Sequence, residues 1–206
     1  MQGTLDTASN GRNPATNAAM GHAEHEDYRL LGLMTFLFSE SLMFGGLFAV
    51  YLVYRSSNGA WPPAGTEVEL LLPAINTVIL VSSSFVIHRG DSAIKKGDVG
   101  GMRFWYLATA LMGIVFLGGQ VYEYLNLGYG LGKNVFSSCF YVMTGFHGLH
   151  VLVGVLLMLG VIWRSRREGH YNAEKHTGVE MTEIYWHFVD IIWIVLFALL
   201  YILTLF

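Results

Sequence analysis

The sequence predicts an all-α membrane protein, a bundle of five transmembrane helices. Only 13% of the 206 residues are charged, half of the share of about 25% that is usual in a soluble domain. The charges are also unevenly placed, because five apolar stretches hold only Glu40, Glu123 and Asp190. Each stretch is long enough to cross a hydrocarbon core of about 30 Å as a helix. We place the spans at residues 30–54, 70–87, 104–126, 135–163 and 184–206.

The residues before and at the start of the bundle give local predictions. Residues 1–28 are rich in Ala, Asn, Thr and Gly with almost no large apolar side chain, so we predict a disordered tail. In the first span Ser41, Gly45 and Ala49 recur every four residues, a spacing that lets a neighbouring backbone approach closely in lipid. Pro73 falls in the first turn of the second span, where its missing N–H costs little.

Glu40 lies close to the middle of the first span. An ionised acid at that depth costs about 2.5–3.5 kcal/mol, so its side chain must face protein or water. One interpretation is a carboxyl group that exchanges protons or contacts lipid, and the other is a group that is only hydrogen-bonded inside the bundle. Because acids inside membranes are commonly functional, we favour the first interpretation.

The third, fourth and fifth spans also carry polar residues. Glu123 lies near the outer end of the third span, where we expect solvent to reach it and its role to be structural. His147 and His150 are three positions apart and share a helix face. We interpret them as hydrogen-bonding to another helix or a lipid headgroup rather than as metal ligands. His187 and Asp190 have the same spacing and can pair, which would make the acid tolerable in the last span.

The positive charges in the loops predict an orientation. The tail, the second loop and the fourth loop together hold ten Lys and Arg residues, whereas the other side of the membrane holds two. Since cytoplasmic loops are enriched in Lys and Arg, the N-terminus should be cytoplasmic and the C-terminus outside. A net charge of −3 without a basic run argues against nucleic acid as a partner.

Five short segments, one per span and in the same order, resemble subunit III of haem–copper terminal oxidases. They are Phe38-Ser-Glu40, Leu72-Pro-Ala-Ile-Asn-Thr77, Gln120-Val-Tyr-Glu-Tyr124, Thr144-Gly-Phe-His-Gly-Leu-His-Val151 and Tyr185-Trp-His-Phe-Val-Asp-Ile-Ile-Trp193. The last two are the most typical of the family. The resemblance implies that residues 29–206 form one subunit III domain. Full-length members have seven helices, and the first span here resembles their third, so we expect part of their lipid cleft to be missing.

The resemblance implies a non-catalytic subunit of a proton-pumping aa3-type cytochrome c oxidase, which reduces oxygen to water. It implies no cofactor or metal in this chain, with haem a and copper in partner subunits I and II. One cysteine, Cys139, is too few for a dinuclear copper site. The chain would pack on subunit I, stabilise it, support proton uptake and bind phospholipids. Cytochrome c would reach the complex through subunit II, at a prokaryotic plasma membrane or an internal membrane such as a thylakoid.

The resemblance also implies roles for individual residues and leaves alternatives. Glu40 matches the family's buried acid, Glu180 its loop acid, and His147 with His150 its paired histidines. Glu at position 40 and Phe146 resemble cytochrome c oxidases more than quinol oxidases. The alternatives are subunit III of a quinol oxidase and a subunit III-like protein associated with nitric oxide reductase. A small transporter working alone is a further alternative, against which the lack of an internal repeat argues.

Overall fold

The computed structural model describes residues 14–66, 68–167 and 169–205, where the regular secondary structure is all helical and no strand occurs. The elements are α1 (Pro14–Ser57), α2 (Leu71–Lys95), α3 (Val99–Asn126), α4 (Val135–Ser165), α5 (Thr177–Phe197) and the short turns η1 (Ala198–Ile202) and η2 (Leu203–Leu205). Five helices are long and apolar enough to cross a membrane. The predicted fold class is therefore confirmed.

The chain divides into two compact units, residues 1–36 and 37–206. Residues 1–13 lie outside the described residues, so the disordered tail stays a prediction there. From Pro14 onward the structure is helical, although we expected no helix before residue 28. Proline at the first position and the alanines that follow favour a helix start. Every contact described below lies within residues 37–206.

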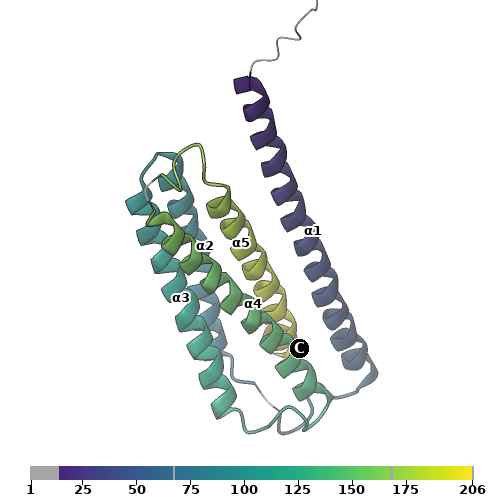
Figure 1. Ribbon diagram of the computed structural model, residues 1–206. Helices are drawn as coiled ribbons and strands as arrows, with labels where there is room; N and C mark the ends of the chain where they lie inside the picture. The colour runs from purple at the N-terminus through teal and green to yellow at the C-terminus, as the bar shows by residue number, and fades with distance from the viewer. Residues whose placement is uncertain (1–13, 67, 168, 206) are drawn as a thin grey trace, which may run out of the picture. The chain divides into compact units, whose positions relative to one another are not determined.

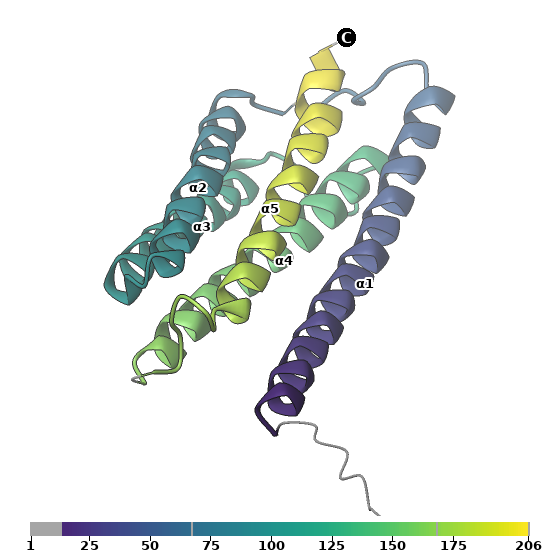
Figure 2. The same cartoon turned by 90° about the horizontal axis from the view of Figure 1, so that it is seen from above.

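Helices α2 to α5 form a four-helix bundle. α2 packs on α3 and α5, and α4 packs on the same two helices (Figures 1 and 2). The α2–α3 and α4–α5 connections lie at one end of this bundle, which we call the α2–α3 end (Figure 1). The C-terminus and the α3–α4 loop lie at the other end. The second half of α1 reaches the bundle through side chains, since the Tyr51 hydroxyl donates to the Leu199 carbonyl at 2.9 Å.

Trp186 of α5 lies at the centre of the bundle and is fully buried. Its Nε1 donates to Ser83 Oγ on α2 at 2.8 Å. Its ring lies so close to Gly113 of α3 and Gly154 of α4 that a Cβ there would come within 2.8 Å and 2.6 Å of ring carbons. The two glycines leave the space that the indole fills. One side chain thereby connects all four helices.

The small-residue stripe of α1 does not pack against another helix of this chain, so that prediction was wrong. Ser41, Gly45 and Ala49 are all exposed. A Cβ at Gly45 would meet no atom of the described residues within 4 Å. The close approaches occur at other glycines, among them Gly119, where a Cβ would come within 2.3 Å of the Asn76 amide. Repeated small residues mark a possible contact face, but the partner decides whether the face is used.

The helices extend beyond the predicted spans, most of all at the α2–α3 end. α2 continues to Lys95 rather than ending at residue 87, and α5 begins at Thr177 rather than at residue 184. The predicted limits followed hydropathy, whereas helical backbone hydrogen bonds continue wherever charged side chains can pair or reach outward. The added turns hold charged residues that the prediction placed in loops.

Helix α4 begins with a capping box formed by Asn134 and Ser137. Asn134 Oδ1 accepts a hydrogen bond from the Ser137 backbone N–H at 2.9 Å, and Ser137 Oγ accepts one from the Asn134 N–H at 3.0 Å. This reciprocal capping box satisfies backbone donors that the first helical turn leaves without partners.

Candidate functional site

Glu40 of α1 has a partner on another helix. Its Oε2 lies 3.2 Å from Nε2 of His150 on α4. The other ring nitrogen of His150, Nδ1, lies 2.7 Å from the Phe146 carbonyl oxygen. A carbonyl oxygen only accepts, so Nδ1 carries a hydrogen and Nε2 needs a proton between itself and the carboxyl oxygen to bond it. The pair is therefore held together by one shared proton.

The surroundings of this pair shield it from solvent. The side chains of Glu40 and His150 are 20% and 12% exposed. The Phe44 ring packs on the imidazole with centroids 5.2 Å apart, and the Tyr185 hydroxyl donates to the His150 carbonyl at 3.1 Å. The predicted intramembrane acid thus faces protein, as its depth requires.

His147 has a different environment from His150. It is fully buried, and its imidazole packs between the rings of Phe116 and Trp193, with centroid distances of 5.8 Å and 4.8 Å. Neither ring nitrogen has a hydrogen-bond partner among the residues that the structure describes. The predicted histidine pair is therefore divided, and only His150 makes the expected hydrogen bond between helices.

A second polar group joins α2 and α5. Ser84 Oγ donates to Asp190 Oδ2 and lies 3.1 Å from His187 Nδ1. The structure thus differs from the predicted direct pair of Asp190 with His187, because a serine from the neighbouring helix lies between them. His187 Nε2 in turn lies 3.4 Å from Glu183 Oε1, which lies 2.9 Å from His88 Nδ1. We call these five residues the α2–α5 polar chain.

Further charged residues continue from this chain at the α2–α3 end. Asp91 Oδ2 lies 2.7 Å from Lys95 Nζ, and Lys95 Nζ lies 3.4 Å from Glu180 Oε1. Glu180 also lies 3.2 Å from His176 Nε2. The expectation of a loop acid at Glu180 was wrong in one respect, since the residue is in the first turn of α5. An acid is favourable there because it faces the positive end of the helix dipole.

Glu123 is buried, so the prediction that solvent reaches it was wrong. It is 7% exposed, and Gln120 Nε2 donates to its Oε2 at 2.9 Å. The Tyr201 hydroxyl donates to its Oε1 at 2.9 Å. Tyr201 belongs to the η1 turn, so these bonds fasten the C-terminal turns to α3. The geometry agrees with a structural role.

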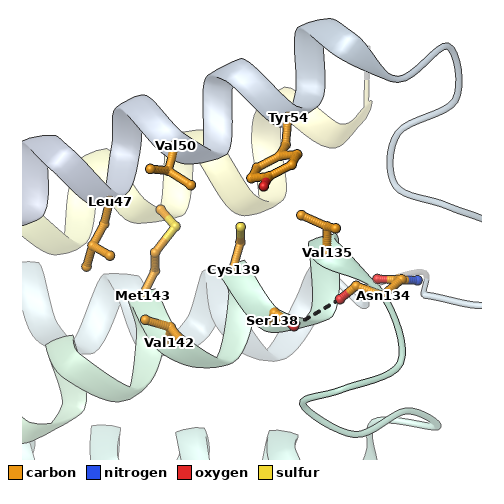
Figure 3. A pocket seen from close by; sticks show the side chains of 9 residues that line it. All are labelled: Leu47, Val50, Tyr54, Asn134, Val135, Ser138, Cys139, Val142 and Met143. Atoms are coloured by element: carbon orange, nitrogen blue, oxygen red, sulfur yellow. Dashed lines mark hydrogen bonds between the residues drawn. The ribbon is translucent and has the colours of Figure 1, made fainter.

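An apolar groove with a volume of about 520 Å³ separates the second half of α1 from the start of α4. Side chains of both helices point into it in Figure 3, with the sulfur of Cys139 among them. The apolar part of its lining comprises Leu47, Val50, Val135, Val142 and Met143. Such a lining suits a hydrocarbon chain.

Our sequence reasoning missed several residues of the polar groups. Ser84, His88, Asp91 and Glu183 were not predicted to be functional. A signal existed for three of them, because Glu183 is four positions before His187 and His88 is three before Asp91. Both spacings place two polar side chains on one helix face. The predicted second span ended just before His88 and Asp91, and the predicted fifth span began just after Glu183.

Comparison with known proteins finds relatives along nearly the whole chain. The family model of cytochrome c oxidase subunit III matches residues 18–205. Cytochrome c oxidase subunit 3 of Thermostichus vulcanus is 70% identical over the full length of both chains. The protein of the same name from Synechocystis sp. is 58% identical over 90% of this chain and 80% of its own. A probable cytochrome c oxidase subunit 3 of Nocardia farcinica is 43% identical over 83% and 86%.

These matches include all five spans, the helices that carry the Glu40–His150 pair and the α2–α5 polar chain. They also confirm the resemblance that the five sequence segments indicated. The chain belongs to the cytochrome c oxidase subunit III family.

Proposed function

We propose that this chain is a non-catalytic subunit of a proton-pumping aa3-type cytochrome c oxidase, in which it stabilises subunit I and supports proton uptake and lipid binding. Its family membership makes it a subunit of a respiratory oxidase complex in a membrane. The names of its relatives favour cytochrome c over quinol as the electron donor of the complex. Haem a and copper would belong to subunits I and II, and cytochrome c would bind through subunit II.

The observation that carries the proton part of the proposal is the contact between Glu40 Oε2 and His150 Nε2 at 3.2 Å. A carboxyl group and an imidazole in contact can pass a proton between them. The loop charges favour a cytoplasmic location for the α2–α3 end. Glu180 and His176 at that end would offer proton-binding groups at the membrane surface.

The lipid part of the proposal rests on the apolar groove. Leu47 at the groove follows Glu40 by seven residues, about 10 Å along the helix. A phospholipid acyl chain in this groove would fill space between α1 and α4 that the side chains of this chain leave open. It would also keep water away from the Glu40–His150 pair.

Two substitutions at Glu40 test the proposal in the assembled oxidase. Glu40→Gln keeps the shape of the side chain but cannot exchange a proton, so the pH dependence of oxygen reduction should change. Glu40→Ala should alter the rate at which the enzyme inactivates during turnover. Haem content should stay at the wild-type level in both. Glu174→Gln, an exposed acid in the α4–α5 loop, is the matched control.

Two results would oppose this function. If Glu40→Gln behaves like wild type at every pH and Glu40→Ala leaves turnover stability and lipid content unchanged, the subunit only braces its partner.

Purification in mild detergent tests the type of complex. An aa3 oxidase brings a-type haem with its absorbance in the red, whereas a different haem would indicate another oxidase. A transporter would come out alone and colourless.

A further inference from the structure

We propose that His88, Asp91 and Glu183 form a binding site for a divalent transition-metal ion such as Zn²⁺ at the α2–α3 end. This site goes beyond the oxidase function and does not depend on it. His88 and Asp91 lie in the last turns of α2, and Glu183 lies in the second turn of α5. One ligand atom from each of the three lies within 4.8 Å of the other two.

The three donors are of the right chemical type. Zn²⁺ binds imidazole nitrogen and carboxylate oxygen at about 2.0–2.2 Å and often uses three protein ligands and a water. At those bond lengths, tetrahedral ligand atoms lie about 3.4 Å apart. The donor atoms of this site therefore need to approach by about 1.4 Å at most. His88 Nδ1 and Glu183 Oε1 are already 2.9 Å apart.

Asp91 supplies an independent reason to expect a ligand. The residue is 1% exposed. Its Oδ1 has no hydrogen-bond partner among the residues that the structure describes. A buried carboxylate oxygen without a partner is costly, and most buried charges are paired or coordinate metals. A cation held by the three residues would satisfy this oxygen.

His88 is the ligand through which an ion from solvent can reach the site. Its side chain is 68% exposed, whereas that of Glu183 is 12% exposed. The imidazole can therefore turn to meet an ion that arrives from solvent, and the outer side of the ion stays open to water. The buried carboxylates form the fixed inner part of the site.

Two basic groups face the site and compete with a metal ion. Lys95 Nζ lies 2.7 Å from Asp91 Oδ2, and His187 Nε2 lies 3.4 Å from Glu183 Oε1. Lys95 is half-exposed and also pairs with Glu180, so it can leave Asp91 without losing every partner.

The site differs from our expectation that this chain holds no metal. That expectation covered the whole chain, and it did not bring His88, Asp91 and Glu183 together. The three ligands come from helix ends that the predicted spans excluded. Their closeness depends on the packing of α2 against α5, which sequence spacing does not contain.

The test measures Zn²⁺ bound to the purified oxidase complex. The complex is first treated with a chelator under conditions that leave haem and copper unchanged, then titrated with Zn²⁺ alone. Bound zinc is counted by mass spectrometry after desalting, and X-ray absorption at the zinc edge reports its ligands. Wild type should bind one ion more than His88→Ala, Asp91→Asn or Glu183→Gln, or bind that ion at least ~10-fold more tightly.

Two further variants sharpen the test. His176→Ala removes a histidine–carboxylate pair at the same end that shares no residue with the site, and it should leave zinc binding unchanged. Lys95→Ala removes the competing ammonium group and should tighten binding. Because His88 is exposed, its substitution should not affect folding even if Asp91→Asn does. Equal zinc affinity in wild type and His88→Ala, or weaker binding in Lys95→Ala, would overturn the proposal.

Discussion

Replacing Gly154 by alanine tests whether the bundle depends on the fit around Trp186. The new Cβ would lie 2.6 Å from Cε3 and 2.8 Å from Cζ3 of the indole. Carbon atoms in favourable contact are about 3.5–4.0 Å apart, so the ring would have to move by about 1 Å. It has little freedom to move, because Gly113 approaches the adjacent ring edge and Nε1 is bonded to Ser83.

The expected loss of stability follows from this crowding. Overpacking a well-packed interior costs roughly 1–3 kcal/mol. Glycine to alanine at an open helical position has the opposite sign and stabilises by roughly 0.5–1 kcal/mol. Gly160 is such a position in the same helix, since a Cβ there would meet none of the described atoms within 4 Å. Both substitutions share this gain, so the free energies of unfolding of Gly154→Ala and Gly160→Ala should differ by the overpacking cost alone, about 1–3 kcal/mol.

The measurement is reversible unfolding of the full chain by sodium dodecyl sulfate in mixed micelles, followed by circular dichroism. Gly154→Ala should unfold at a lower detergent fraction than wild type, and Gly160→Ala at an equal or higher one. Gly113→Ala and its open neighbour Gly118→Ala give an independent pair in α3. If the crowded and the open positions respond alike, the indole is not confined by the two glycines.

Three other predictions concern single side chains. Tyr201→Phe removes a hydroxyl that donates to buried Glu123 and should lower the free energy of unfolding by about 1–3 kcal/mol in the same assay; an unchanged value would mean that water replaces the hydroxyl. Asn134→Ala removes the capping box of α4 and should cost about 0.5–2 kcal/mol, unless the Ser137 side chain alone caps the helix. Burial raises the pKa of the Tyr129 phenol, which lies in the α3–α4 loop. The folded chain then holds this proton at a pH where the unfolded chain has released it, so stability should fall as the pH rises above about 10. Tyr129→Phe should reduce that fall, and a fall equal to that of wild type would exclude Tyr129 as its cause.

The membrane class and the five spans could be predicted because lipid permits few structures. An unpaired backbone cannot face hydrocarbon, so long stretches without charge must be helices. The depth of Glu40 could be predicted for the same reason. The ends of α2 and α5 could not, because hydropathy falls before the backbone leaves the helix. Lys95 and Glu180 lie in those last turns.

The partners of the buried acids could not be predicted, since they come from distant parts of the chain. His150 is 110 residues from Glu40, and Ser84 is 106 residues from Asp190. Spacing on one helix shows which residues share a face, but not which helix that face meets. Glu123 was therefore placed in solvent although Tyr201 covers it.

In the proposed proton-exchanging role, the Glu40–His150 pair would respond to the membrane voltage. Removing or adding a proton changes the charge of the pair by one elementary unit. Glu40 lies near the middle of the span Tyr28–Ser57, so a proton that reaches it from either side crosses about half of the transmembrane field. A full crossing is worth about 2.3 kcal/mol per 100 mV, and half of it about 1 kcal/mol. Proton occupancy of the pair would then change several-fold between an energised and a relaxed membrane.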